Sequence, residues 1–233
     1  MIAILDYGLG NLASVENMFR KIGVKEVTIT KQPEQIAQCK KLLLPGVGAF
    51  DAGMTLLEQT GLIPLLNHKV LVEKVPVLGI CLGMQMLGKG SEEGKLNGLG
   101  WIDAHSVKFN PPAGSQYKVP HMGWEYVQVI KENPLLSREV KSRFYFVHSY
   151  HVVCEDLEQS IGIAKFDHTF TCMVNKENIF GTQFHPEFKS RPGRPDPAFY
   201  GFIKASLDKR NGRPHPEFIA EIGESAEARH LHL

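Results

Sequence analysis

The first eighty residues alternate short apolar runs with segments of helical periodicity, and this alternation restricts the fold more than any other feature of the chain. Residues 1–5 are typical of a buried strand, and a glycine turn and apolar residues at helical spacing follow them as far as Gly23. Further strands are predicted at 27–30, 41–44 and 75–80, with helical segments from Pro33 and over 51–57 and 62–72. Parallel strands joined by crossover helices produce this pattern.

From about Trp101 the pattern changes to strands without intervening helices. They are predicted at residues 102–109, 126–130, 144–147, 161–166, 171–174 and 179–184. An antiparallel extension of the same sheet accommodates them better than further crossover units. The sequence therefore predicts an α/β fold with an open, mostly parallel sheet, flanking helices and an antiparallel extension.

The predicted domain spans residues 1–209 and closes with a helix from Pro195 to about Asp208, because an N-cap and a first-turn proline begin that segment. Residues 210–233 are polar and lack sustained periodicity, so they are predicted to form a tail.

The charge of the chain is nearly balanced, which restricts its partners. Its 26 basic side chains offset 25 acidic ones, for a formal net charge of +1. We therefore expect a small substrate, no nucleic acid and no membrane surface. The N-terminus reaches Asp6 without a basic region, and no apolar stretch approaches the roughly 18 residues of a membrane span. We expect a soluble cytoplasmic protein.

Four scattered cysteines, Cys39, Cys81, Cys154 and Cys172, form no CxxC pair, so neither a zinc site nor a disulfide framework is expected. Cys81 has a distinctive context, because the run GICLG at 79–83 joins an apolar strand to a helical segment. This is the strand–turn–helix elbow of G-x-S-x-G hydrolases, with cysteine as the nucleophile. The following helix N-terminus favours a thiolate, and the amide of Leu82 can donate to an oxyanion. The alternative is a buried cysteine without a chemical role.

A thiolate nucleophile requires a base, and ten histidines are present. His185 follows a predicted strand that ends at the sheet edge, and Glu187 is two residues away. A carboxylate in that place can orient the imidazole and stabilise its cation. The same tetrapeptide, HPEF, recurs at His215 within the polar tail, where no strand positions it, so that copy is interpreted as a bystander.

Other candidate sites have weaker support. His148 and His151 suggest a metal site, but on an extended segment they are predicted to point to opposite faces, with no third ligand nearby. His121 is interpreted as structural. The glycine-rich loop at 44–50 lacks the lysine and serine of a phosphate-binding loop, and we expect it to supply oxyanion amides. No metal and no cofactor are predicted.

Three runs, PGVG at 45–48, GICLGMQ at 79–85 and HPE at 185–187, together resemble the class I, triad-type glutamine amidotransferases, whose fold is flavodoxin-like. More narrowly, residues 6–12, 91–93, 119–124, 146–150 and 180–184 look like the family of glutaminase subunits of imidazole glycerol phosphate synthase. The resemblance covers about residues 1–187.

This resemblance implies a glutaminase. Cys81 would attack the amide of glutamine, His185 would carry the proton to ammonia, and Glu187 would orient His185. The resemblance also implies residues that contact substrate: oxyanion amides at Val47 and Leu82, and glutamine contacts at Gly48, Gln85, Glu93, Ser149 and Tyr150. The implied partner is a (β/α)8 cyclase subunit, which receives ammonia through a tunnel and forms a heterodimer with the glutaminase.

Two positions depart from the narrower family. Glu125 stands where the family has Asn, and Phe188 stands where it has Lys. Residues 188–195 and 201–205 look like the end of the glutaminase domain of CTP synthase. Two alternatives therefore remain open: a glutaminase subunit that feeds another synthase, in nucleotide or surface-sugar amidation, or a catalytically silent binding subunit.

Overall fold

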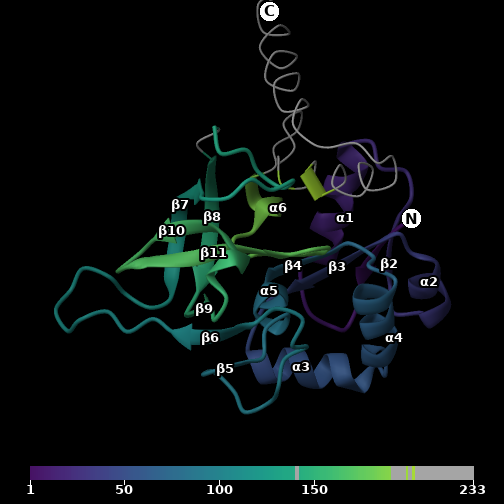
Figure 1. The fold of residues 1–233 in the computed structure, drawn as a ribbon, viewed down its shortest axis with the longest axis horizontal. Coiled ribbons are helices and arrows are strands. Elements are labelled where there is room, and N and C mark those ends of the chain that lie inside the picture. The colour runs from purple at the N-terminus through teal and green to yellow at the C-terminus, as the bar shows by residue number, and fades with distance from the viewer. Residues whose placement is uncertain (140–141, 190–197, 199–200, 203–233) are drawn as a thin grey trace, which may run out of the picture.

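One mixed β-sheet organises the chain (Figure 1). The computed structural model describes residues 1–139, 142–189, 198, 201 and 202, and twelve strands of this part form the sheet. Nine of them follow one another in the order β2-β1-β3-β4-β12-β11-β10-β7-β8, while β5, β6 and β9 branch from this path.

The first half of the sheet is parallel. β1 (Ile2–Leu5) lies between β2 (Val27–Thr30) and β3 (Lys41–Gly46), and β3 pairs with β4 (Val77–Cys81). β12 (Ile179–Thr182) pairs in parallel with the other side of β4. Strands β1, β3, β4 and β12 are buried along their whole length, as parallel strands covered on both faces must be.

The second half of the sheet is antiparallel. β11 (Thr169–Lys176), β10 (Ser160–Lys165), β7 (His121–Val129) and β8 (Ser142–His148) continue the sheet beyond β12. β9 (Tyr150–Cys154) pairs with β11 and with β6 (Ala104–Lys108), which pairs in parallel with the short β5 (Gly90–Ser91).

Helices cover both faces of the parallel half. Side chains of β1 alternate, so that Ile2 and Ile4 belong to one apolar core and Ala3 and Leu5 to the other. α1 (Leu12–Lys21) packs on the first face. The second face carries α2 (Pro33–Gln38), α3 (Phe50–Gln59), α4 (Ile63–Asn67), a π-helix (His68–Val72) and α5 (Leu82–Met86). Figure 1 shows α1 and α6 (Pro186–Lys189) on one side of the sheet, with α3 and α5 on the other.

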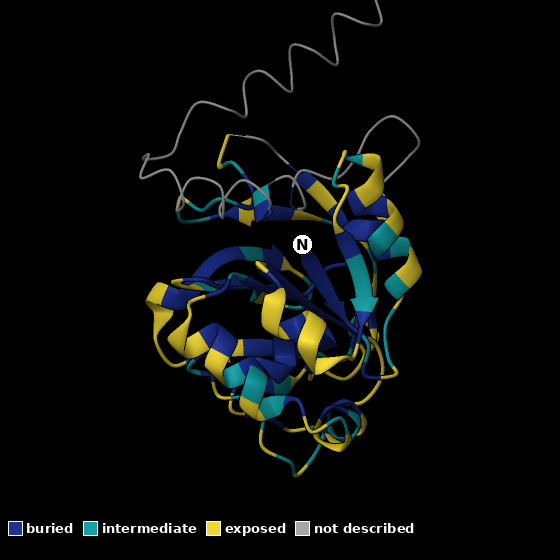
Figure 2. Cartoon of the chain, turned by 90° about the vertical axis from the view of Figure 1, so that its right-hand side faces the viewer, coloured by how far each residue is buried: buried dark blue, intermediate teal, exposed yellow. Residues whose placement is uncertain are grey.

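The burial pattern follows from this layering. Figure 2 shows buried strands between helices whose outer turns are exposed. α1 illustrates the cause, because Val15, Met18 and Phe19 recur at helical spacing on its buried face, and Arg20 and Lys21 in its last turn complement the helix dipole. A short 3-10 helix (Leu157–Gln159) connects β9 with β10.

The predicted fold class is confirmed, including the antiparallel extension. The structure differs in detail, because residues 62–72 form α4 and a π-helix and because β5 and β9 were not predicted. Of the predicted helix at 195–208, only residues 198, 201 and 202 are described, and they are helical; the tail at 210–233 lies outside the described residues. Among the described helices, none has the length and apolar character of a membrane span.

Candidate active site

Cys81 ends β4 and immediately precedes α5, in a backbone conformation (φ 55°, ψ −112°) that non-glycine residues rarely adopt. Gly79 and Gly83 approach neighbouring backbone so closely that a side chain at either position would collide. A Cβ atom on Gly79 would lie 2.7 Å from the carbonyl oxygen of Gly83, and one on Gly83 would overlap that of Leu44. The run at 79–83 therefore forms the strained elbow that its sequence suggests.

The glycine-rich loop that follows β3 lies beside this elbow. Gly46 is the residue of β3 that pairs with Cys81, so Val47 and Gly48 follow at the same edge of the sheet. Val47 is exposed and Gly48 has a positive φ of 103°. Leu82, on the other side of Cys81, opens α5 and is buried. Both predicted sources of oxyanion amides are thus next to the thiol in sequence or in register.

His185 reaches the same edge from the far end of the chain. β12 runs beside β4 and ends at Thr182, and the backbone N–H of His185 then donates to the carbonyl oxygen of Tyr145 at 3.0 Å. The imidazole Nδ1 atom lies 2.9 Å from Oε1 of Glu187, in the first turn of α6. Both side chains are buried, so this contact is a desolvated histidine–carboxylate pair.

The surroundings of His185 favour its cationic form. Burial lowers the pKa of His185, but Cys81 and Glu187 oppose this effect, and the pKa is raised to about 10. The Nε2 atom of His185 is buried and has no hydrogen-bond partner of good geometry among the described residues. Cys81 is nevertheless close enough to raise the pKa of the imidazole. Nε2 is thus the nitrogen available to the thiol, because Nδ1 is engaged by Glu187.

One glutamine side chain lies against the thiol, and a second is hydrogen-bonded to the first. Gln183, which is completely buried, directs its Nε2 atom to Sγ of Cys81 at 3.7 Å. Its Oε1 atom accepts from Nε2 of Gln85 at 3.1 Å, and the same Nε2 atom donates to the carbonyl oxygen of Tyr150 at 3.1 Å. Both amide hydrogens of Gln85 are therefore engaged, so Gln85 presents only its carbonyl oxygen to a ligand.

The remaining predicted contacts gather near Tyr150. Burial and the negative charges of Glu93 and Glu92 raise the pKa of Tyr150. Oε2 of Glu93 accepts from the backbone N–H of Phe50 at 2.8 Å. This bond satisfies one of the N–H donors that the first turn of α3 leaves without a partner inside the helix. Ser149 lies between β8 and β9, directly before Tyr150. Glu93 is thus tied to the start of α3, directly after the glycine-rich loop, and Tyr150 is tied through its carbonyl oxygen to Gln85.

Sequence reasoning did not assign a role to Gln183 or to Tyr7. Both belong to runs that carry the family resemblance, and the position of Gln183, two residues before His185, was the available signal. The hydroxyl of Tyr7 donates to the carbonyl oxygen of Pro45 at 2.7 Å, at the start of the glycine-rich loop. Burial and the proximity of Cys81 raise the pKa of Tyr7.

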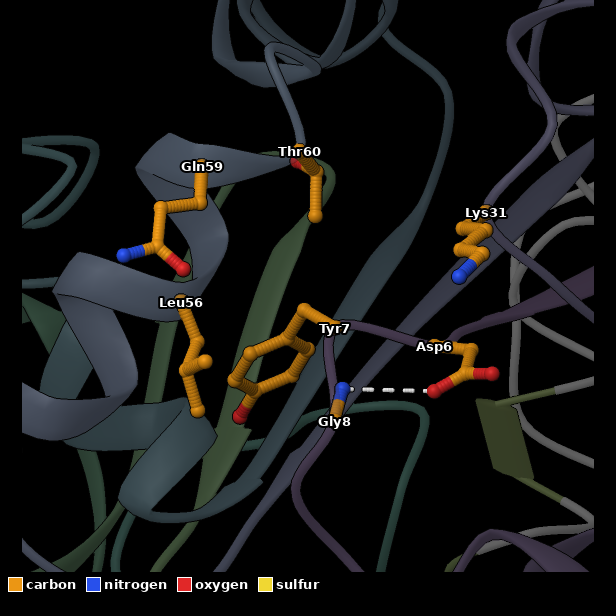
Figure 3. A pocket seen from close by; sticks show the side chains of 7 residues that line it. All are labelled: Asp6, Tyr7, Gly8, Lys31, Leu56, Gln59 and Thr60. Carbon is orange, nitrogen blue, oxygen red and sulfur yellow. Dashed lines mark hydrogen bonds between the residues drawn. The ribbon is translucent and has the colours of Figure 1, made fainter.

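Tyr7 also lines a pocket of about 380 Å³ (Figure 3). Lys31 and Asp6 lie on one side of it and Leu56 and Gln59 on the other, and Oδ1 of Asp6 accepts from the backbone N–H of Gly8 at 3.2 Å. The lining does not include Cys81 or His185. Tyr7 therefore contacts both this pocket and the start of the glycine-rich loop.

The predicted opposite orientation of His148 and His151 was wrong. Both rings pack against Phe109, with centroid distances of 5.3 and 4.5 Å, because the chain turns between β8 and β9 and is not one extended segment. Nδ1 of His121 lies 3.1 Å from Nε2 of His148, and His151 similarly contacts His168. In the described part of the chain, no group of three or more His, Cys, Asp or Glu side chains has the arrangement of a metal site.

The two departures from the narrower family lie on β7 and in α6. Glu125 pairs with Phe144 across β7 and β8 and is half-buried. Phe188 stacks on the ring of His185, with a centroid distance of 5.0 Å. The second HPEF run, at His215, lies outside the described residues.

Comparisons with known proteins identify the family of the chain. A family model described as glutamine amidotransferase class-I matches residues 3–205. The chain is 53% identical over 188 residues to imidazole glycerol phosphate synthase subunit HisH 2 of Methanococcus maripaludis, which covers 80% of this chain and 92% of the relative. It is 49% identical, with the same coverage, to the protein of that name from Pseudomonas aeruginosa.

Solved structures show the same fold at low sequence identity. The glutaminase domain of Trypanosoma brucei CTPS matches with a TM-score of 0.62 and 18% identity over 89% of this chain and 93% of that one. PurLQS of Thermotoga maritima matches with a TM-score of 0.62 and 16% identity over 90% and 98%. The chain therefore belongs to the class-I glutamine amidotransferases and, within them, to the HisH family.

Proposed function

We propose that this chain is the glutaminase subunit of an imidazole glycerol phosphate synthase in histidine biosynthesis, and that it passes ammonia to a (β/α)8 cyclase subunit. The observation that carries the proposal is the convergence of Cys81, His185 and Glu187 at one sheet edge in a chain 53% identical to a HisH subunit.

The geometry supports a cysteine-based hydrolysis. Sγ of Cys81 attacks the side-chain carbonyl carbon of glutamine, and its proton passes to Nε2 of His185. His185 then protonates the leaving nitrogen, the carbon–nitrogen bond breaks, and ammonia and a thioester form. Water attacks the thioester with His185 as base, which releases glutamate and restores the thiol. Glu187 holds Nδ1 at 2.9 Å and stabilises the imidazolium throughout.

The residues around the triad supply binding and charge stabilisation. Backbone amides of Val47 and Leu82 are proposed to donate to the oxyanion of the tetrahedral intermediate. Gly48, Gln85, Glu93, Ser149 and Tyr150 are proposed to contact the bound glutamine. The carbonyl oxygen of Gln85 and the carboxylate of Glu93 are acceptors, which suits the ammonium and amide hydrogens of that substrate.

An exposed aromatic face beside His185 supports docking of the cyclase. We define the docking face as Met122, Trp124 and Tyr126, which point outward at alternating positions of β7, together with Phe188. Each of the four side chains is between 41% and 61% exposed. Aromatic residues and methionine are enriched in protein–protein interfaces relative to the rest of the protein surface. Because this face adjoins the triad, a partner bound there receives ammonia close to where it forms.

Docking also has a chemical reason. Free ammonia becomes protonated in water at neutral pH and is then no nucleophile, so the product must reach its acceptor without crossing solvent. In the proposed complex the cyclase joins ammonia to a phosphorylated aminoimidazole-carboxamide ribonucleotide intermediate. The products are imidazole glycerol phosphate and aminoimidazole-carboxamide ribotide. The glycine-rich loop can restrain the glutaminase until the partner is loaded.

Glutamate release tests the proposal. We expect the isolated chain to release glutamate slowly and the mixture with the cyclase and its nucleotide ligand to release it much faster. Cys81→Ser removes glutamine-dependent turnover but leaves ammonia-dependent synthesis by the cyclase. Loss of both would show that Cys81 is structural.

Two other results would contradict the assignment. Stimulation by a different synthase, and not by the cyclase, would place the chain in another amidation pathway. Equal glutamate release by the wild type and Cys81→Ala in every mixture would leave only a silent binding subunit.

A further inference from the structure

The side-chain amide of Gln183 lies against the thiol of Cys81. Gln183 follows β12, its backbone N–H donates to the carbonyl oxygen of Cys172 at 2.9 Å, and its side chain is fully buried. The Nε2 atom lies 3.7 Å from Sγ of Cys81, within the range of an N–H donor to sulfur.

The direction of this amide follows from its other contacts. The carbonyl oxygen of Tyr150 can only accept, so the atom of Gln85 that lies 3.1 Å from it is the NH₂ group. The same NH₂ group then meets Oε1 of Gln183 at 3.1 Å. A flipped Gln183 amide would place two donors face to face and direct a carbonyl oxygen at the sulfur. The N–H of Gln183 therefore points at Cys81.

We propose that Gln183 stabilises the thiolate of Cys81 by donating its amide hydrogen to the sulfur, and so supports the nucleophile of the triad. When the thiol proton moves to Nε2 of His185, the sulfur gains a negative charge in a buried place. A preoriented neutral donor stabilises that charge without adding a charge of its own. The role of this thiolate in catalysis rests on the proposed glutaminase activity. Its stabilisation by Gln183 can be measured without that activity.

Alkylation of Cys81 measures this effect in the isolated chain. Iodoacetamide reacts with thiolate, so the rate of modification of the Cys81 peptide, followed by mass spectrometry across pH, reports thiolate formation. Cys39, Cys154 and Cys172 serve as internal controls, because burial raises the pKa of Cys39 and Cys154 to about 11 and that of Cys172 well above its usual range.

Two substitutions separate the donor from the packing. Gln183→Glu keeps the shape and an acceptor for Gln85 but replaces the donor with a carboxylate beside the sulfur. Gln183→Met removes both hydrogen bonds. We expect the midpoint of Cys81 alkylation to rise by about one pH unit in Gln183→Met and by more in Gln183→Glu, as for the loss of a hydrogen bond to a charged group.

The control is Gln159→Met. Gln159 is also a buried glutamine with side-chain hydrogen bonds, to Asp156 and to the backbone of Asp103, and belongs to the 3-10 helix. Its substitution should leave the midpoint unchanged. Circular dichroism and thermal unfolding identify variants that do not fold, and the near-isosteric Gln183→Glu keeps the test available if Gln183→Met is among them.

An unchanged midpoint in a folded Gln183→Glu or Gln183→Met variant overturns the inference. With the cyclase present, Gln183→Glu should lower kcat by about tenfold and leave KM for glutamine within about twofold, because it keeps the acceptor for Gln85 and alters the contact to the nucleophile. If the wild type releases no glutamate in any mixture, the proposed function fails, yet the alkylation result still decides the role of Gln183.

Discussion

The ring of Phe188 lies over the imidazole of His185, with centroids 5.0 Å apart and an angle of 25° between the ring planes. Phe188 also meets Tyr145 edge-on at 5.8 Å, and Tyr145 meets Trp124 at 5.7 Å. These contacts connect the proposed catalytic base with the docking face. Phe188, one of the two residues that depart from the HisH-like pattern, thus contacts the triad directly.

Phe188→Ala should lower kcat by about fivefold and change KM for glutamine by less than about twofold. The stacked ring holds the imidazole plane, and aromatic pairs of this kind contribute about 0.5–1.5 kcal/mol. Phe188→Tyr, which keeps the ring, should retain wild-type kcat. Steady-state glutaminase kinetics at saturating cyclase checks this, and equal kcat values for Phe188→Ala and Phe188→Tyr would refute the positioning role.

Glu187→Gln should destabilise the protein more at pH 6 than at pH 10. The pKa of His185 is raised to about 10, because Cys81 and Glu187 outweigh the effect of burial. Since the unfolded value is about 6.5, this stabilisation is complete below pH 6.5 and disappears as the pH rises towards 10.

Urea unfolding at pH 6, 8 and 10 measures this dependence. The loss of unfolding free energy should be about 1–3 kcal/mol at pH 6 and should shrink with rising pH. Glu58→Gln alters an exposed carboxylate of α3 and serves as the control. A loss that is the same at all three pH values would show that the pair does not stabilise the imidazolium.

The histidine cluster around Phe109 should make the fold sensitive to acid. Burial lowers the pKa of His121 and His151 to about 4 and that of His148 to about 3. Their folded values lie below the unfolded value of about 6.5, so the stability present above pH 6.5 is lost as the pH falls towards 4. Each ring contributes a slope of up to about 1.4 kcal/mol per pH unit.

His151→Phe should reduce that slope, because it removes one titrating ring and keeps an aromatic group against Phe109 and Phe170. His68→Phe alters a mostly exposed histidine and serves as the control. The unfolding free energies of both variants at pH 7, 6 and 5 give the two slopes to be compared. Identical slopes for the two variants would mean that burial does not keep His151 from binding a proton as readily as it does in the unfolded chain.

Tyr7→Phe should weaken both the fold and the activity. The substitution removes the hydrogen bond to Pro45, which costs about 1 kcal/mol of unfolding free energy. It also loosens the loop before Val47, so kcat should fall by about threefold to tenfold. Tyr117→Phe, where the ring pairs with Phe166, is the matched control for loss of a hydroxyl. Wild-type kcat in Tyr7→Phe would show that the loop does not depend on this contact.

Much of the fold could be predicted from local patterns. The alternation of apolar runs and helical periodicity predicted the parallel strands, because both signals depend on residues a few positions apart. The strand β9 was missed because its partners, β6 and β11, are distant in sequence. The same turn between β8 and β9 brings His148 and His151 to one aromatic cluster, which an extended-chain model could not predict.

The sequence by itself determined that Cys81 occupies a tight strand–turn–helix elbow, because glycines at 79 and 83 and the flanking apolar runs are local requirements of that turn. Only the tertiary structure decided which groups surround the sulfur. The amide of Gln183 points at Cys81 because its direction depends on Gln85 and on the carbonyl oxygen of Tyr150, which other elements carry. Turn geometry is a property of neighbouring residues, whereas the orientation of a buried amide depends on every acceptor and donor that packing brings against it.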